Sequence, residues 1–124
     1  MTVLVDSDIL IEVSRGRNAG IIRRWAELGD SREAIICSPV SVAELWHGAR
    51  PEEHGVIANL FQALVCVPID IETGRKAGEF LQKYRKSHGL ELGDALIASS
   101  AVLNGAALWT RNRKHYPMPG LSFV

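Results

Sequence analysis

The sequence predicts an α/β fold in which a central, mostly parallel β-sheet is covered by helices on both faces. Short apolar runs rich in β-branched residues alternate with longer segments whose apolar residues recur with the period of a helix. Such alternation is typical of parallel sheets, because parallel strands need long crossover connections. A chain of 124 residues, of which 47% are hydrophobic and 23% charged, is expected to form one domain over residues 1–124.

The first expected strand covers residues 2–5, an apolar run that ends at Asp6. A parallel strand would deliver this carboxylate at its C-terminal end, where open α/β sheets bind their ligands. An apolar helical stripe follows directly, so Ser7 or Asp8 is expected to cap a first helix. A second helix with one apolar face is predicted over residues 19–28.

The middle of the chain is predicted to contain two further strands, over residues 34–37 and 65–69. The helix that follows the first of them contains Ser41 and Glu44, whose spacing fits a capping box. Glu44 is therefore expected in the first turn of that helix, either as a structural cap or as a functional carboxylate. Another amphipathic helix is predicted over residues 52–64.

The last third of the chain is organised around a helix that is buried on most sides. Residues 95–103 carry no charge, and Asp94 stands where this helix begins, either as an N-cap or as a functional group. Residues 106–109 then form the next apolar strand. The long amphipathic helix before this segment is expected to be capped by Asp70.

The charge and the cysteines restrict the class of protein. Fourteen basic and fourteen acidic side chains give a net charge of zero, which excludes a global basic field for nucleic acid. The N-terminus lacks a basic secretory region, and no apolar run is long enough to span a membrane, so a cytoplasmic protein is expected. Cys37 and Cys66 lie in apolar runs and are expected to be buried free thiols.

Three carboxylates, those of Asp6, Glu44 and Asp94, are expected to face one edge of the sheet. Grouping them is costly unless a cation binds, because they repel one another and lose hydration. Oxygen ligands suit Mg²⁺ or Mn²⁺, and the chain has no Cys/His spacing of a zinc site. A metal held in this way commonly serves phosphate chemistry, because it orients a water molecule and stabilises developing negative charge.

Four segments, in register along nearly the whole chain, resemble the signature segments of PIN-domain proteins, specifically the VapC toxins of type II toxin–antitoxin systems. They are VLVDSDILI, SVAELWHGA, LGDALIASSA and LWTRNRKHY. The resemblance implies an α/β/α sandwich and a Mg²⁺- or Mn²⁺-dependent endoribonuclease that cleaves structured RNA. It also implies that Asp6, Glu44 and Asp94 are the catalytic, metal-binding acids.

The fourth segment lacks the acid that the family pattern places there. Thr110, Asn112 and His115 occupy its polar positions, so it supplies no carboxylate and weakens the case for a second metal ion. Asp8 is expected beside the metal ligands as a hydrogen-bond partner rather than as a ligand. Ser7 and Thr110 are candidates for the same supporting role, and His115 is a candidate for a phosphate contact.

Partners are also implied by the resemblance. Arg111, Arg113 and Lys114 form a basic cluster beside the acids, which is the local RNA contact that a zero net charge requires. A VapB-type antitoxin is expected to lay a segment in a groove of the toxin. Trp25 and Trp46 are candidates for antitoxin or dimer contacts, since Trp is enriched at binding hot spots, although core burial would explain both. A homodimer, and a heterotetramer or larger assembly with the antitoxin, are expected.

One other enzyme class, a phospho-receiver domain and a non-enzymatic PIN domain compete with this interpretation. Asp6 and Asp8 mimic the D-x-D motif of a HAD-like phosphatase, but the region after Thr110 offers none of the further acids that this chemistry needs. A phospho-receiver domain would need its acceptor Asp after the third strand, where Asp70 caps a helix instead. A degenerate PIN domain that only binds a partner is the third alternative, and metal binding with ribonuclease activity would exclude it.

Overall fold

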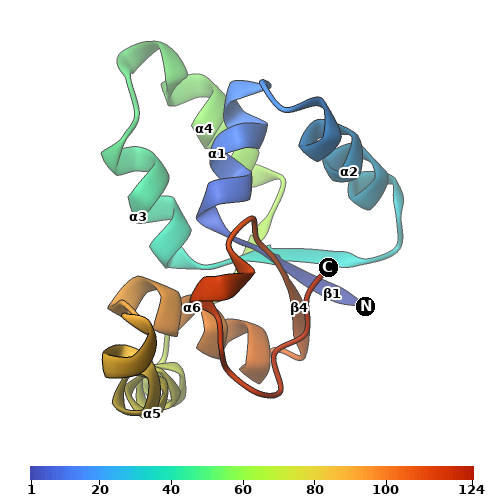
Figure 1. The fold of residues 1–124 in the computed structure, drawn as a ribbon. Helices are drawn as coiled ribbons and strands as arrows, with labels where there is room; N and C mark the ends of the chain where they lie inside the picture. Colours follow the sequence, from blue (N-terminus) through green and yellow to red (C-terminus); the bar gives the residue numbers. More distant parts are fainter.

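The structure, a computed structural model, describes residues 1–124 and contains one four-stranded sheet between two layers of helices (Figure 1). The strand order is β3-β2-β1-β4, and every pairing is parallel. The predicted α/β class and its parallel sheet are thus confirmed. The strands are β1 (Thr2–Val5), β2 (Ala34–Cys37), β3 (Val65–Cys66) and β4 (Ala106–Trp109).

Six α-helices and two 3₁₀ turns complete the fold. In Figure 1, α1 to α4 lie on the upper side of the sheet and α5 and α6 on the lower side. The helices are α1 (Ser7–Arg15), α2 (Ala19–Asp30), α3 (Pro39–His47), α4 (His54–Gln62), α5 (Ile71–His88) and α6 (Leu92–Leu103), and the 3₁₀ turns cover Pro51–Glu53 and Arg113–His115.

The sheet separates two hydrophobic cores because side chains alternate along each strand. On β1, Val3 and Val5 face the layer that contains α1 to α4, and Leu4 faces α5 and α6. Helix α6 packs closely against the sheet, since small residues such as Ala98 and Ala101 on its buried side are fully inaccessible to solvent. The central strands are therefore buried on both faces, and their C-terminal ends can reach the surface only at one edge.

The helix caps differ from the predicted ones in the first half of the chain. Asp6, and neither Ser7 nor Asp8, caps α1, because its Oδ1 accepts a hydrogen bond of 2.7 Å from the Ser7 N–H. Ser38 caps α3 one residue before Pro39, so the capping box over Ser41 and Glu44 is wrong. Proline at the first helical position, preceded by serine, is itself a start signal.

Strand β3 is shorter than predicted, since it pairs with β2 through only two residues, Val65 and Cys66. Pro68 follows, and a proline has no N–H to continue a ladder. Cys37 is fully buried, as predicted, but Cys66 is exposed, and the two cysteines are free thiols. None of the helices combines the length and the apolar character needed to cross a lipid bilayer.

Candidate active site at the carboxyl ends of the strands

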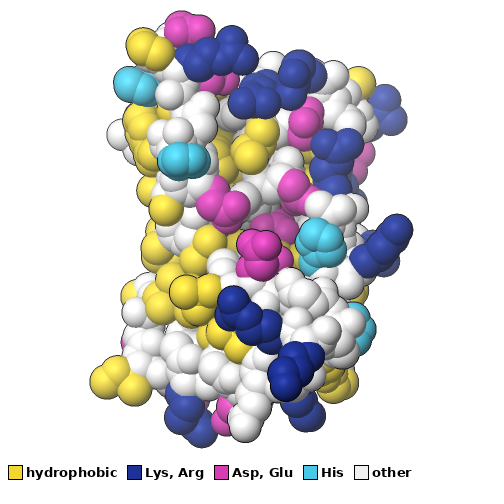
Figure 2. All heavy atoms as spheres, turned by 60° about the vertical axis from the view of Figure 1, so that its left-hand side comes forward, with side chains coloured by type: hydrophobic (Ala, Val, Ile, Leu, Met, Phe, Trp, Pro, Cys, Tyr) yellow, Lys and Arg dark blue, Asp and Glu magenta, His cyan; other side chains and the backbone are white.

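The predicted site residues come together where β1 and β4 end. Asp6 follows β1, Thr110 follows β4, and Asp94 lies in the first turn of α6. Figure 2 shows acidic side chains gathered in the middle of one face, with Lys and Arg side chains above and below them. The parallel register explains this convergence, because Val5 pairs with Trp109 at the ends of the two strands.

Asp6 is the most firmly held of the acids, and only 7% of its surface is exposed. Its Oδ1 accepts the Ser7 N–H as the helix cap, at 2.7 Å. Its Oδ2 accepts two hydroxyl hydrogen bonds, from Thr110 Oγ1 at 2.9 Å and from the Tyr116 hydroxyl at 2.7 Å. The carboxylate of Asp6 is therefore fixed in orientation by donors from three segments of the chain.

Asp94 is not a helix cap, so that interpretation is wrong. Glu91 occupies the N-cap position of α6 without a side-chain bond, and Asp94 lies inside the first turn. Its Oδ1 is 3.4 Å from the Tyr116 hydroxyl. Burial, and then the charge of Asp6, raise the pKa of Asp94, while the charge of His115 acts in the opposite direction. The ionised form of this carboxylate is therefore less favourable than it is in water, and a bound cation would offset that cost.

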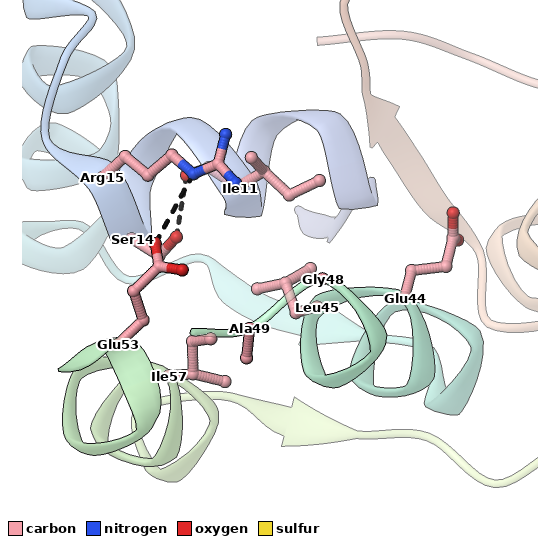
Figure 3. A pocket seen from close by; sticks show the side chains of 9 residues that line it. All are labelled: Ile11, Ser14, Arg15, Glu44, Leu45, Gly48, Ala49, Glu53 and Ile57. Atoms are coloured by element: carbon pink, nitrogen blue, oxygen red, sulfur yellow. Dashed lines mark hydrogen bonds and ion pairs between the residues drawn. The ribbon is translucent and has the colours of Figure 1, made fainter. Parts of the chain in front are cut away.

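Glu44 reaches the same region from α3, where it lies in the second turn rather than the first. Its Oε1 accepts a hydrogen bond of 2.8 Å from Ser7 Oγ, and this hydroxyl also lies 2.8 Å from Ser41 Oγ. Ser41 is fully buried between α1 and α3. Figure 3 shows Glu44 at the end of a pocket, directed away from the ion pair of Arg15 and Glu53.

Asp8 lies beside Asp6 and supports the loop after β4. Its Oδ2 accepts hydrogen bonds from the Arg111 N–H at 2.9 Å and from Thr110 Oγ1 at 3.3 Å. Its Oδ1 is buried and has no hydrogen-bond partner. Burial, and then the charge of Asp6, raise the pKa of Asp8. Three acids of this edge thus share one electrostatic environment, since Asp6 acts on both Asp8 and Asp94.

As these side chains lie, no group of three or more Asp, Glu, His or Cys side chains surrounds a common point in a way that could hold a metal ion. Hydroxyl and backbone donors take up the carboxylate oxygens instead. Tyr116, which donates to Asp6, and Ser41, which is hydrogen-bonded to the Ser7 hydroxyl, were not among the predicted site residues. Tyr116 could have been noticed in the sequence, because it lies in the polar segment after a strand end. The hydroxyl of a tyrosine buried there needs a hydrogen-bond partner.

The predicted RNA-contact residues have unequal surroundings. The guanidinium of Arg111 forms an ion pair of 3.3 Å with Glu12. Arg113 donates a hydrogen bond of 2.7 Å to the Val124 carbonyl, so it holds the C-terminal segment. Lys114 and His115 are exposed, and Asn112, also exposed, adds no carboxylate to the site. Lys114 has no ion pair or hydrogen bond within the protein, so of the three basic residues it is the one most available to a ligand.

The two tryptophans also differ. Trp25 is partly buried and packs against the core between the sheet and α1 to α4. Trp46 on α3 is 40% exposed, with its ring centroid 5.2 Å from that of His54. Trp46 is therefore exposed enough to contact a partner protein, whereas Trp25 contributes to the core.

The fold and the site together define an α/β protein with an acidic site at the C-terminal edge of a parallel sheet. Residues 3–121 match the PIN domain. Ribonuclease VapC10 of Mycobacterium tuberculosis is 37% identical over 117 residues, which cover 94% of this chain and 86% of that protein. Ribonuclease VapC19 of the same organism is 34% identical over 116 residues, 93% of this chain and 92% of that protein. The chain therefore belongs to the PIN-domain family, and among its members it is similar to the VapC ribonucleases.

Solved structures agree on the fold. VapBC2 from Rickettsia felis, bound to a DNA fragment from its promoter, superposes with a TM-score of 0.84 at 20% identity and covers 100% of this chain and 98% of that chain. DNA-bound VapBC from Salmonella typhimurium gives a TM-score of 0.84 at 18% identity, over 100% of this chain and 97% of that chain. Membership in the PIN-domain family sets aside the phosphatase and phospho-receiver alternatives.

Proposed function

We propose that residues 1–124 act as one PIN domain, the ribonuclease toxin of a toxin–antitoxin pair, and that Asp6, Glu44 and Asp94 bind a catalytic Mg²⁺ or Mn²⁺ ion. The observations that support this proposal are two indirect links between the acids. The Tyr116 hydroxyl lies between Asp6 and Asp94, and Ser7 is hydrogen-bonded to both Asp6 and Glu44. The pKa of Asp94 is raised by burial and by the charge of Asp6. Such carboxylates favour a cation that neutralises them.

The donor atoms of these residues have the chemistry that a hard divalent cation prefers, and binding would require the acids to turn toward a common point. All the acidic side chains of this edge offer oxygen, the donor that Mg²⁺ and Mn²⁺ prefer, and the two cysteines lie in β2 and β3. The buried Oδ1 of Asp8 has no hydrogen-bond partner, which is costly for a carboxylate oxygen unless positive charge is near. When bound, the cation would orient a water molecule and stabilise negative charge on the scissile phosphate.

The chain's own side chains would orient the acids and the substrate. Thr110 fixes Asp6 and Ser7 fixes Glu44 by hydrogen bonds, so both carboxylates are partly organised before a ligand arrives. Lys114 can contact RNA phosphates, which supplies affinity without sequence information. His115 lies close enough to Asp94 for its charge to lower the pKa of that acid, a place from which it can reach a phosphate.

The partner is proposed to be a VapB-type antitoxin, in keeping with the similarity to VapC ribonucleases and VapBC structures. Its segment would occupy the pocket between α1, α3 and α4, where Figure 3 shows apolar Ile11, Leu45 and Ile57 between Glu44 and the Arg15–Glu53 ion pair. A basic antitoxin side chain could pair with Glu44 there. A homodimer, and a larger assembly with the antitoxin, stay predictions.

Cleavage of a structured RNA by the purified chain, freed of antitoxin, tests this function. Cleavage should require Mg²⁺ or Mn²⁺, stop with a chelator and resume when the metal is restored. Asp94→Asn should reduce the rate by roughly 100-fold or more, because the loss of a ligand should cost at least as much as the roughly 10- to 100-fold cost of losing a ligand's hydrogen-bond partner. Equal cleavage with and without metal, or by the variant, would contradict the proposal, and a chain that binds metal without cleaving RNA would favour the degenerate, partner-binding alternative.

A further inference from the structure

The hydroxyl of Tyr116 is the one side-chain group that touches both Asp6 and Asp94. It donates a hydrogen bond of 2.7 Å to Asp6 Oδ2 and lies 3.4 Å from Asp94 Oδ1. Only 4% of the Tyr116 surface is exposed, so the tyrosine is largely shielded from water, whereas Asp94 is partly exposed. Asp6 lies between β1 and α1, Asp94 lies in α6, and Tyr116 comes from the segment after β4. One hydroxyl therefore joins three separate elements at the acidic edge.

The two carboxylates depend on this hydroxyl to different degrees. Asp6 also receives hydrogen bonds from the Ser7 N–H and Thr110 Oγ1, so its orientation survives the loss of one donor. The hydroxyl has one proton, which it donates mainly to Asp6 at 2.7 Å, so Asp94 receives only the longer branch of a shared hydrogen bond at 3.4 Å, and no other hydrogen bond reaches its side chain. From this difference we propose that Tyr116 is a positioning residue, whose hydroxyl sets the orientation of Asp94 relative to Asp6 for binding the divalent cation.

The position of the hydroxyl is itself fixed by packing. The ring of Tyr116 belongs to the core between the sheet and α5 and α6, together with Leu108 and Met118. Beyond it, the chain returns to β4, where the Leu108 N–H donates to the Ser122 carbonyl at 2.8 Å and the Val124 N–H donates to the Leu108 carbonyl at 3.0 Å. A hydroxyl anchored in this way can orient a less constrained carboxylate, because the ring cannot follow it.

Two other roles for the hydroxyl make different predictions. A buried phenol that merely needs an acceptor would affect folding stability and leave metal affinity unchanged. A hydroxyl that competes with the cation for the carboxylate oxygens would weaken metal binding, so its removal would strengthen it. The positioning role predicts weaker binding on removal. The inference rests on the proposed function, because it requires that the acids bind a divalent cation.

The test compares Tyr116→Phe with Tyr84→Phe in the full chain, freed of antitoxin and metal. Phe keeps the ring and its packing and removes one oxygen. Tyr84 is the chain's other tyrosine, packs partly buried against the same core, and has a hydroxyl without a hydrogen bond to the site. Mn²⁺ affinity is measured by titration calorimetry, folding by circular dichroism, and RNA cleavage by kcat and KM.

Tyr116→Phe should bind Mn²⁺ roughly 10- to 100-fold more weakly than the wild type, the usual cost of losing a partner of a metal ligand. Its kcat at fixed Mn²⁺ should fall while KM for RNA stays unchanged, and Tyr84→Phe should match the wild type in both. Equal or tighter Mn²⁺ binding by folded Tyr116→Phe would overturn the positioning role and leave the proposed function standing. A wild type that binds no Mn²⁺ would overturn the proposed function itself, and this inference with it.

Discussion

The acids of this site are not equivalent, although all lie at one sheet edge. Asp6 accepts hydrogen bonds from the Ser7 N–H, Thr110 and Tyr116 and caps α1, so its charge is compensated within the protein. Asp94 has a single hydroxyl contact at 3.4 Å, and burial raises its pKa. Asp8 leaves one buried oxygen without a partner. Substitutions that remove one negative charge should therefore have opposite effects on the stability of the metal-free protein.

Asp94→Asn should raise the melting temperature of the metal-free chain, because it removes a carboxylate that burial and Asp6 disfavour. Asp6→Asn should lower it, by about 1–2 kcal/mol of unfolding free energy, because it weakens the cap and a charge-assisted hydrogen bond. From the sequence, both variants would be expected to keep or gain stability, and the hydrogen bonds of Asp6 revise that expectation. Thermal melting in a chelator measures both, and a matching fall in the two variants would show that the acids do not repel one another.

The raised pKa of Asp94 predicts how the stability of the metal-free protein changes with pH. The folded state holds a proton on Asp94 more tightly than the unfolded chain does, so stability falls as pH rises from the ordinary value of 3.8 through the raised pKa. Asp94→Asn cannot titrate at this position, and the fall should be smaller in that variant over the same range. Melting curves of the wild type and Asp94→Asn at several pH values, recorded without metal, measure this difference.

Glu44→Gln separates the charge of this residue from its hydrogen bond. Gln keeps an oxygen that can accept from Ser7 Oγ, so stability should change by less than about 0.5 kcal/mol. Metal-dependent RNA cleavage should nevertheless fall by roughly 10- to 100-fold, if the charge contributes to the metal site. Cleavage at the wild-type rate would remove Glu44 from the metal site and leave it as a contact for the antitoxin.

At the scale of elements, the turn between α6 and β4 sets the start of β4, and Thr110 directly follows the end of that strand. Gly105 has a φ of 61°, in the left-handed region that only glycine enters without strain. Gly105→Ala should destabilise the protein by about 1–2 kcal/mol. Gly78, exposed in the middle of α5, offers the control, because a methyl group there meets nothing within 4 Å and Gly78→Ala should stabilise by about 0.5–1 kcal/mol. Denaturant unfolding measures the free energy of unfolding of both variants. If Gly105→Ala stabilised the protein as much as Gly78→Ala does, the role of the turn would be contradicted.

For the molecule as a whole, the sequence predicted the strands better than the helix starts. Each of β1, β2 and β4 has the bounds that its apolar run predicts, because a strand buried on both faces has no polar residue inside it. The helix starts were missed where two residues could serve as cap. Ser38 and Ser41 both precede apolar residues, and the proline that follows Ser38 is the signal that distinguishes the actual cap.

In the candidate site, the places of Asp6 and Asp94 in the fold could be predicted from the sequence, and their hydrogen-bond donors could not. Asp6 and Asp94 were placed by strand ends and helix starts, which are local in sequence. The Tyr116 hydroxyl reaches Asp6 across 110 positions of the sequence, a contact that depends on the path of the whole C-terminal segment. Long-range side-chain contacts of this kind follow from tertiary packing and leave no local pattern.

The central claim is that the acidic edge of the sheet binds a divalent cation, and thermal melting in the presence of Mn²⁺ tests it most directly. Ligands that bind only the folded state raise the unfolding free energy by about 2.7 kcal/mol at a concentration 100 times the dissociation constant. The melting temperature of the wild-type chain, freed of antitoxin, should therefore rise steadily with Mn²⁺ concentration, and that of Asp94→Asn should rise much less. Equal rises in the two proteins, or no rise in the wild type, would contradict the claim.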